Sequence, residues 1–313
     1  MLIKYILKRL GYTVVTLFIL VAATFFMMRL LPGDPFIGEK ALPQTTIKAL
    51  NAKYGLDKPL AVQFMIYIGN VCKGDLGLSM NYDNRAVTDI IAQAFPYSCE
   101  LGLRALIFAT IMGILLGVLA AVKRGSKWDT GAMLISIVGV SIPSFILGAL
   151  LQYALGLKLY QWTGIKFFGI TGWTDLSTKI LPSFALSLGT LAKISRLMRT
   201  SMLDVLGQDY MKTAKSKGLK PNTIIWRHGV RNAIMPIITI LGPIAASLLT
   251  GAFIVENIFS IPGMGKFFVI GVQTQDYTLI AGVVLFYGAF LIIANLIVDL
   301  LYGVIDPRVK LTK

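Results

Sequence analysis

Long apolar segments separated by polar loops run along most of this sequence, and their lengths suit membrane helices. The apolar segments cover residues 10–28, 101–122, 131–157, 180–201, 233–255 and 278–305. A helix needs about 20 apolar residues to cross the hydrocarbon core of a bilayer. Unpaired backbone groups are costly in lipid, so such segments are expected to be helical. The pattern therefore predicts an all-α membrane protein with six transmembrane helices.

The distribution of Lys and Arg indicates how these helices are oriented. Lys4, Lys8 and Arg9 precede the first apolar segment and no small-x-small cleavage site follows it, so we expect an uncleaved first helix. With six spans, the dense Lys/Arg clusters fall on one side of the membrane, whereas loops on the other side also carry acids such as Asp57 and Asp75. Cytoplasmic loops are the ones enriched in Lys and Arg. Both termini are therefore predicted to be cytoplasmic.

The first external loop is long and is predicted to be ordered. Two sets of its apolar residues follow helical spacing: Leu60, Phe64, Tyr67 and Val71, and then Val87, Ile90, Ile91, Ala94 and Phe95. Such spacing is typical of amphipathic helices. We therefore divide the chain into a first transmembrane helix at 1–30, an extracytoplasmic loop with amphipathic helices at 31–98, and a core of five transmembrane helices at 99–313.

Two of the membrane helices are predicted to be irregular because they contain proline. Pro143 lies inside the apolar segment 131–157 and is expected to kink it, since proline removes one backbone hydrogen bond. Gly242 and Pro243 are expected to break the segment 233–255 near its middle. Neighbouring helices can satisfy the backbone groups that such breaks release within the membrane.

Composition supports a membrane protein and excludes several other classes. Of the 313 residues, 56% are hydrophobic and 14% are charged, against about 25% charged in an average soluble domain. The net charge of +15 does not indicate nucleic-acid binding, because no nucleic-acid motif accompanies it. Two cysteines, Cys72 and Cys99, are too few for a disulfide framework and leave a single bridge open. With His228 as the one histidine, no metal site is expected.

Residues suited to catalysis, cofactor binding or ion coupling are scarce. The GxxxxGK[ST] pattern of a phosphate-binding loop does not occur, and a single histidine in a basic loop does not suit a Ser-His-Asp triad. Intramembrane carboxylates, which mark proton and ion pathways, are limited to Asp299 and, at a boundary, Glu256. No catalytic residue and no cofactor is therefore predicted, and any energy that a pathway through these helices needs would have to come from another protein.

Residues 193–236, which we call the basic segment, are the strongest candidate for contact with such a protein. Asp204 and Asp209 are its acids, against many Lys and Arg residues. At its start, Lys193, Arg196 and Arg199 recur every three residues along the end of the fourth apolar segment. They either extend to the membrane surface or contact the loop that follows, and the sequence leaves both interpretations open.

Four motifs resemble the dipeptide/oligopeptide permease family of ABC importers. The run YMKTAKSKG at 210–218, inside SRLMRTSMLDVLGQDYMKTAKSKGL, resembles the coupling motif of ABC-importer permeases, acid-Ala-Ala-x-x-x-Gly. Its first three places hold Lys212, Thr213 and Ala214, so the acid is absent. The other matches are LPGDP at 31–35, ENIFSIPGMGKFF at 256–268 and VDLLYGVIDPR at 298–308.

The resemblance implies a permease subunit of an ATP-driven ABC importer that carries di- or oligopeptides across the plasma membrane. It implies several partners: a second, related permease subunit, two cytoplasmic ABC ATPase subunits, and an extracytoplasmic peptide-binding protein. The ATPase subunits would hydrolyse ATP, so the permease itself would not be an enzyme.

The same resemblance implies that a coupling loop at 202–232 docks on the ATPase. The residues expected to make the contact are Tyr210, Lys212, Thr213, Ala214, Lys217 and Gly218. A helix is expected over 202–219, because this stretch is rich in helix formers and Gly218 is a stop signal. Ala214 and Gly218 are four residues apart and would share one face of that helix, whose small side chains would allow close approach.

Two alternatives remain open at this point. The same architecture could import another cargo, such as nickel or a small glycan, because coupling motifs do not describe the cargo. The chain could also be an ion-coupled carrier or channel that acts alone, although its few intramembrane carboxylates do not favour this.

Overall fold

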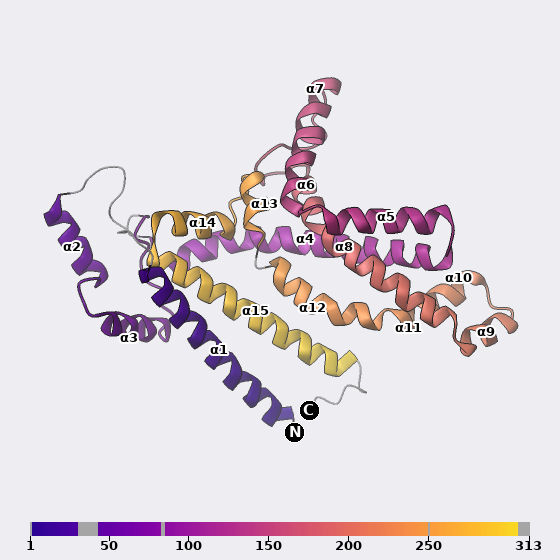
Figure 1. Cartoon of the computed structure of the whole chain (residues 1–313), viewed down its shortest axis with the longest axis horizontal. Coiled ribbons are helices and arrows are strands. Elements are labelled where there is room, and N and C mark those ends of the chain that lie inside the picture. The colour runs from indigo at the N-terminus through magenta and orange to yellow at the C-terminus, as the bar shows by residue number, and fades with distance from the viewer. Residues whose placement is uncertain (1, 31–42, 83–84, 250, 306–313) are drawn as a thin grey trace. The chain divides into compact units, whose positions relative to one another are not determined.

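The computed structural model describes residues 2–30, 43–82, 85–249 and 251–305, and these residues are helical throughout their regular elements. One isolated antiparallel bridge, between Leu78 and Ala86, is the exception among them. The chain folds into two compact units (Figure 1): unit 1 holds Met1–Ser98 and Pro262–Lys313, and unit 2 holds Cys99–Ile261. The all-α prediction is confirmed for the described residues. The motif at 31–35 and the end of the motif at 298–308 lie outside them.

Unit 1 is built from helices near both ends of the chain. Its elements are α1 (Leu2–Leu30), α2 (Gln44–Tyr54), α3 (Leu60–Val71), the start of α4 (Val87–Val122), α14 (Met264–Thr274) and α15 (Tyr277–Ile305). Helices α1 and α15 lie side by side (Figure 1). The stripe predicted at 87–95 is packed, because Ile90 and Ile91 are buried against Met264 and Leu279. The loop predicted to be external is thus ordered in its described part.

Asp276 ties the segment before α4 to the beginning of α15. Its carboxylate is fully buried, and its Oδ1 accepts a hydrogen bond from the amide of Leu279 at 2.9 Å. Its Oδ2 accepts from the Ser79 hydroxyl at 2.5 Å and from the amides of Met80 and Asn81 at 2.9 and 3.1 Å. A carboxylate that accepts from the first turn of a helix caps it. The same group therefore caps α15 and holds the neighbouring loop.

Unit 2 contains the longest run of consecutive elements. After the remainder of α4, they are α5 (Lys127–Ser141), α6 (Ser144–Leu151), η1 (Gln152–Lys158), α7 (Leu159–Thr163), α8 (Leu176–Leu206), α9 (Asp209–Ser216), α10 (Pro221–Thr223), η2 (Ile224–Val230), α11 (Arg231–Ala233), α12 (Met235–Leu249) and α13 (Phe253–Ile258). Helix α8 is the central element, since α5, α6 and α12 all pack against it. Ile194, Met198 and Met202 of α8 are fully buried in its core.

Glycines allow α4 to approach α8 closely. A Cβ atom on Gly117 would lie 2.6 Å from the carbonyl oxygen of Ser195 and 2.6 Å from Cβ of Met198. A Cβ atom on Gly113, one turn earlier, would lie 2.8 Å from Cγ2 of Ile194. Helices in membranes associate through such small-residue contacts, because lipid provides no hydrophobic drive for their association.

Three described helices are long and apolar enough to cross a membrane: Gly11–Leu30, Val87–Val122 and Tyr277–Ile297. Two further pairs qualify if each bent pair is one span: Lys127–Ser141 with Ser144–Thr163, bent by 104°, and Pro221–Ala233 with Met235–Leu249, bent by 53°. Helix α8 has 31 residues, but Lys179 and Lys193 leave only 180–192 between them free of charge. The structure supports three to five spans, and the sixth stays a prediction.

The prolines act differently from the sequence predictions. Helix α4 continues through Pro96 for 36 residues, so the separate helices expected at 87–95 and 101–122 are one. At Pro143 the chain breaks instead of kinking, because Ile142 adopts an extended conformation that the residue before proline favours. Pro243 lies inside the continuous α12. The predicted break there is wrong: the bend falls at Ile234, just before Pro236.

We predict that Gly117→Val lowers the thermal stability of the purified protein. The added side chain would enter the contact with α8, and overpacking of this kind costs about 1–3 kcal/mol. The measurement is the melting temperature in detergent. Gly131→Val is the matched control, since a Cβ atom at Gly131 would meet nothing within 4 Å. Equal melting temperatures for the two variants would contradict the close-contact interpretation.

Candidate functional site

The basic segment forms several short elements instead of one helix. Helix α8 ends at Leu206, and the chain turns at Gly207 and Gln208 before α9 begins. Gly207 donates its amide to the carbonyl of Leu203 at 3.2 Å, and Gln208 has an extended ψ of 152°. Glycine is a poor helix former, which explains why α8 ends just before Gly207. The single helix expected over 202–219 is therefore wrong, and the coupling candidate is α9, with eight residues.

Helix α9 packs back on its own chain through one face. Met211 is fully buried and Ala214 is 5% exposed, and both contact the buried Ile224 at the start of η2. The half-buried Val205 and Leu206 complete this cluster. Ala214 therefore contacts the end of α8 and the start of η2, so its side chain is not available on the outer surface.

Gly218 lies beyond the end of α9 and sets the turn that follows. Its φ is +71°, a left-handed conformation that favours glycine. Its amide donates to the carbonyl of Lys215 at 2.9 Å, and the amide of Leu219 reaches the carbonyl of Ala214 at 3.4 Å. Glycine commonly ends helices in this way. The expectation that Ala214 and Gly218 share one exposed helical face is therefore wrong.

The other four predicted residues lie on the exposed side of this region. Tyr210 is 43% exposed, and Lys212, Thr213 and Lys217 are also exposed. Lys212 forms an ion pair with Asp209 at 2.8 Å, and the Thr213 hydroxyl donates to the carbonyl of Asp209 at 3.1 Å. Exposed ion pairs contribute little to stability, so these side chains are free to exchange partners.

The segment η2 packs directly on α8. A Cβ atom on Gly229 would overlap the end of the Met202 side chain, which is fully buried. A glycine at this position thus leaves room for the end of the Met202 side chain. His228, expected to be an exposed loop histidine, is half-buried in the helical η2, and its carbonyl accepts a hydrogen bond from Asn232 at 2.7 Å.

A bidentate ion pair joins α8 to α5. Arg199 Nε donates to Oδ1 of Asp129 at 2.7 Å, and Arg199 Nη2 donates to Oδ2 at 2.8 Å. The amide of Gly125 also donates to Oδ2 at 3.0 Å. Arg196, one turn away, donates to the carbonyl of Ser136 at 3.0 Å. These arginines thus bind α5, which neither interpretation of their spacing foresaw.

Sequence reasoning missed Asp129, although a signal was present. It is the only acidic residue between Glu100 and Asp175, and it stands among cations at the start of an apolar segment. An isolated carboxylate in that position is expected to pair with a cation of another helix. The side chain is 9% exposed in the structure, which fits such a role.

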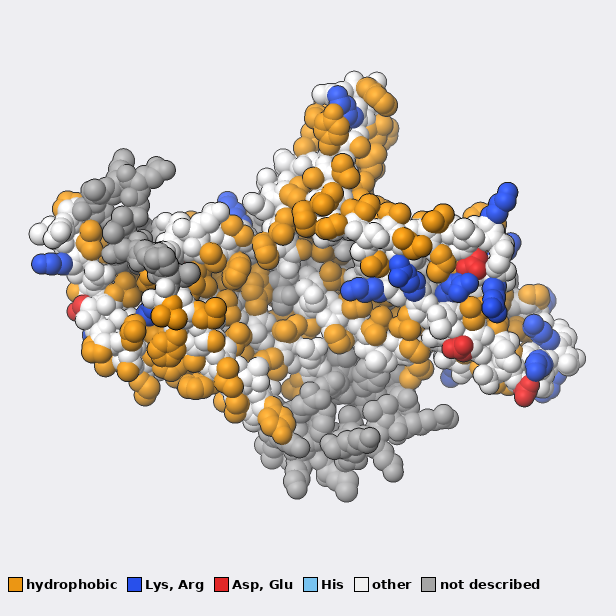
Figure 2. All heavy atoms as spheres, viewed as in Figure 1, with side chains coloured by type: hydrophobic (Ala, Val, Ile, Leu, Met, Phe, Trp, Pro, Cys, Tyr) orange, Lys and Arg blue, Asp and Glu red, His pale blue; other side chains and the backbone are white. Residues whose placement is uncertain are grey.

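The outer side of the basic segment is strongly cationic. Figure 2 shows Lys and Arg side chains gathered over the end of unit 2 that carries α9 and α10. The exposed cations there are Lys212, Lys215, Lys217, Lys220, Arg227 and Arg231. Among the described residues, no group of three or more His, Cys, Asp and Glu side chains could hold a metal ion. Because its exposed side chains are cationic, this surface is suited to contact with a protein that carries acidic groups.

Comparison with known proteins identifies the family. Residues 113–311 match the model of the binding-protein-dependent transport system inner membrane component, and residues 1–102 match the model of its N-terminal part. The chain belongs to this family. The permease is 44% identical over 312 residues to the dipeptide transport system permease protein DppB of Bacillus subtilis, covering 99% of both chains.

A second relative agrees with this assignment, and a solved structure has a similar fold. The permease is 41% identical to the oligopeptide transport system permease protein OppB of Haemophilus influenzae, covering 98% of this chain and 99% of the relative. Its fold resembles a chain of the MetNI methionine ABC transporter in an inward-facing conformation, with a TM-score of 0.54 and 16% identity. That match covers 71% of this chain and 97% of the other. The resemblance seen in the sequence and the inner-membrane location are thereby confirmed.

The two thiols of the permease are unpaired in the structure. Cys72 is exposed and Cys99 is half-buried, and both are free.

We predict that Asp129→Asn destabilises the permease by about 2 kcal/mol, because hydrogen bonds to charged groups contribute about 1.5–3 kcal/mol each. The double variant Asp129→Arg with Arg199→Asp exchanges the two charges, and it should melt at a higher temperature than either of its single variants. Thermal unfolding in detergent measures both effects. If the double variant melts no higher than the weaker of its two single variants, the ion pair does not join the helices.

Proposed function

We propose that this permease is the membrane subunit of an ATP-driven ABC importer for dipeptides and oligopeptides. The observation that carries the proposal is identity of 44% and 41%, over nearly the whole chain, to proteins named as dipeptide and oligopeptide transport permeases. Import of nickel or small glycans is less favoured, because those relatives name peptides. A lone ion-coupled carrier is less favoured because the family is defined by dependence on a binding protein.

The proposed membrane arrangement has six spans with both termini in the cytoplasm. The spans are α1, the apolar part of α4, the bent pair from α5 to α7, α8, α12 and α15. The concentration of Lys and Arg between the start of α9 and the start of α11 supports a cytoplasmic position for the basic segment. The proposed division of the chain at residues 30 and 98 follows from the same arrangement.

The proposed partners are a second, related permease subunit, two cytoplasmic ATPase subunits and an extracytoplasmic peptide-binding protein. The name of the family and the likeness of the fold to chains of ABC transporters support them. ATP hydrolysis is assigned to the ATPase subunits, because the sequence has no phosphate-binding loop.

We assign the ATPase contact to the exposed side of α9 and the turn after it. Tyr210, Lys212, Thr213 and Lys217 would touch the partner. Ala214 and Gly218 would act indirectly, since Ala214 seats α9 on α8 and η2 and Gly218 shapes the turn. A force on α9 would pass through Met211 and Ala214 into α8, and through the Arg199–Asp129 pair into α5.

The orientation predicts which thiols are reachable from outside the cell. The native Cys72 is exposed, and it should react with an impermeant maleimide applied to intact cells or spheroplasts. In a background with Cys72→Ser and Cys99→Ser, Asp175→Cys should also react, whereas Lys220→Cys should react only after permeabilisation. Reaction of Lys220→Cys from outside would contradict the orientation.

The function is tested by uptake of labelled dialanine into proteoliposomes that hold the complete transporter. Uptake should require ATP and the binding protein, and an ion gradient alone should not drive it. Tyr210→Ala should reduce uptake and stimulated ATP hydrolysis about tenfold without changing the melting temperature, because it removes only contact surface. Ala214→Leu should instead lower the melting temperature, since overpacking a buried position costs about 1–3 kcal/mol.

Tyr160→Ala is the control for this experiment, because Tyr160 is 47% exposed, close to the 43% of Tyr210, and lies on α7. It should leave the stimulated hydrolysis unchanged. Normal hydrolysis in Tyr210→Ala would remove this residue from the proposed contact, and uptake without ATP would contradict the importer itself.

A further inference from the structure

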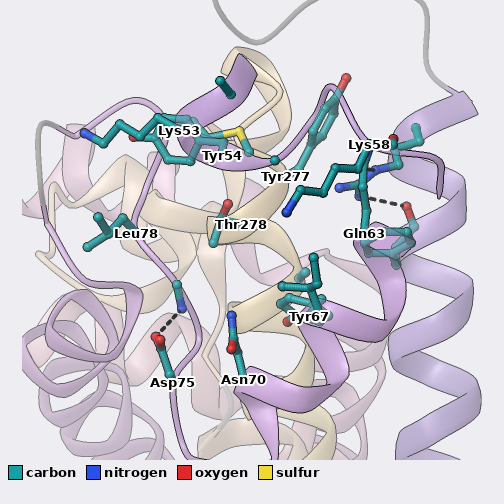
Figure 3. Close-up of a pocket in the computed structure, with 18 residues that line it drawn as sticks. Lys53, Tyr54, Lys58, Gln63, Tyr67, Asn70, Asp75, Leu78, Tyr277 and Thr278 are labelled. Carbon is teal, nitrogen blue, oxygen red and sulfur yellow. Dashed lines mark hydrogen bonds between the residues drawn. The ribbon is translucent and has the colours of Figure 1, made fainter. Parts of the chain in front are cut away.

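Unit 1 contains a cavity of about 410 Å³ that the proposed coupling does not use (Figure 3). It lies between the end of α1, α2, α3 and the start of α15. Cavities of about 300–1,000 Å³ are typical of small-molecule sites. Its walls combine aromatic side chains with charges of both signs, which distinguishes it from a gap between apolar helices.

Arg29 is held in this cavity with its charge uncompensated by any described acid. Its Nε donates to Oε1 of Gln63 at 2.9 Å, and its Cζ lies 3.6 Å from the centre of the Phe25 ring. Gln63 is itself fixed, because its amide nitrogen donates to the carbonyl of Lys58 at 2.8 Å. No described carboxylate forms an ion pair with Arg29 or Lys58. Two cations therefore line one side of the cavity, with donors left for an anion.

Tyr67 adds a further donor. Its hydroxyl is buried and has no hydrogen-bond partner among the described residues. Burial raises the pKa of Tyr67 to about 12, against an opposing effect of the nearby Arg29, so the phenol stays protonated at neutral pH. Buried polar groups in native proteins are almost always hydrogen-bonded. The unused hydroxyl near Arg29 therefore indicates a place for a hydrogen-bond acceptor.

An acid lies across the cavity from these cations. Figure 3 shows Asp75 and Lys58 on different elements around the same space. Oδ1 of Asp75 accepts a hydrogen bond from the amide of Gly77 at 2.8 Å, which fixes the side chain and leaves its other oxygen available. Tyr277 provides an aromatic wall beside the cations, 5.2 Å from Cζ of Arg29. The cavity thus presents separate places for an anion and for a cation.

We propose that this cavity binds a short peptide as a zwitterion. Its carboxylate would lie at Arg29, Lys58 and the Tyr67 hydroxyl, and its ammonium group at Asp75. This inference rests on the proposed function, because the ligand that it places in the cavity is the cargo of the proposed importer. A lipid phosphate shares the anionic chemistry. The acid on the opposite wall favours the peptide, because it provides a place for the peptide's ammonium group.

The test uses the complete transporter without its binding protein, in nanodiscs of phosphatidylcholine, titrated with dialanine by calorimetry. Dialanine should bind at least tenfold more tightly than its C-terminal amide and than N-acetyl-dialanine. Lys58→Gln should weaken dialanine tenfold and remove the discrimination against the amide. Asp75→Asn should remove the discrimination against the acetylated peptide. Lys73→Gln is the matched control, since Lys73 is exposed and does not line the cavity.

Tyr67→Phe separates binding from a structural role. It removes a hydroxyl that has no described partner, so the melting temperature without ligand should not fall, whereas the affinity for dialanine should fall about tenfold. A lower melting temperature with unchanged affinity would show that the hydroxyl is structural and would overturn its assignment to the ligand.

Two further results would overturn the site. One is equal binding of dialanine and its amide. The other is that phosphatidylglycerol co-purifies with the wild type but not with Lys58→Gln, and that dialanine does not displace this lipid. Such a result would assign the cavity to lipid. ATP-driven uptake of dialanine is measured on the same preparation. Uptake of dialanine without binding to the cavity would contradict this inference alone. A complete transporter that does not take up dialanine would contradict the proposed function.

Discussion

Close contact between α8 and the helices around it is the constraint on which unit 2 depends. A Cβ atom on Gly117 of α4 or on Gly139 of α5 would lie within 2.8 Å of the α8 backbone. Contacts of this kind replace the hydrophobic drive that lipid does not provide. At these glycines the helices are in close contact, so a displacement of α8 would be transmitted to its neighbours there. The short elements that follow α8 are therefore attached to a tightly packed axis.

This axis gives the proposed coupling a physical route. The buried face of α9 contacts the end of α8, and the bidentate Arg199–Asp129 pair joins the same part of α8 to α5. Coupling between distant sites travels through such contiguous contacts when the elements move as units. The exposed and buried residues of α9 then have separate tasks, because contact with a partner and transmission into the membrane helices need opposite faces.

The sequence predicts the helices well where hydrophobic length decides, and less well where proline or a helix end decides. The segment expected at 278–305 is α15, Tyr277–Ile305. Pro96 and Pro243 are accommodated inside helices, whereas Pro143 ends one, and the three differ in packing that spacing alone does not encode.

The candidate site shows the same division. The sequence indicates which segment is the candidate contact, but a four-residue spacing could not show that α9 ends at Ser216, before Gly218. Asp129 was not predicted from the sequence, because its partner, Arg199, is 70 residues away along the chain.

In unit 1, the loop proposed to be external is an ordered structure in its described part. The buried carboxylate of Asp276 is satisfied by one hydroxyl and three backbone amides, so the loop before α4 is fixed to α15 without a pairing cation. Such an arrangement is costly to bury unless every acceptor is used, and it holds the loop in one conformation. The same loop carries Asp75 to one wall of the cavity, and Gln63 fixes Arg29 on another. A ligand that entered would find its partners already ordered, which reduces the entropy lost on binding.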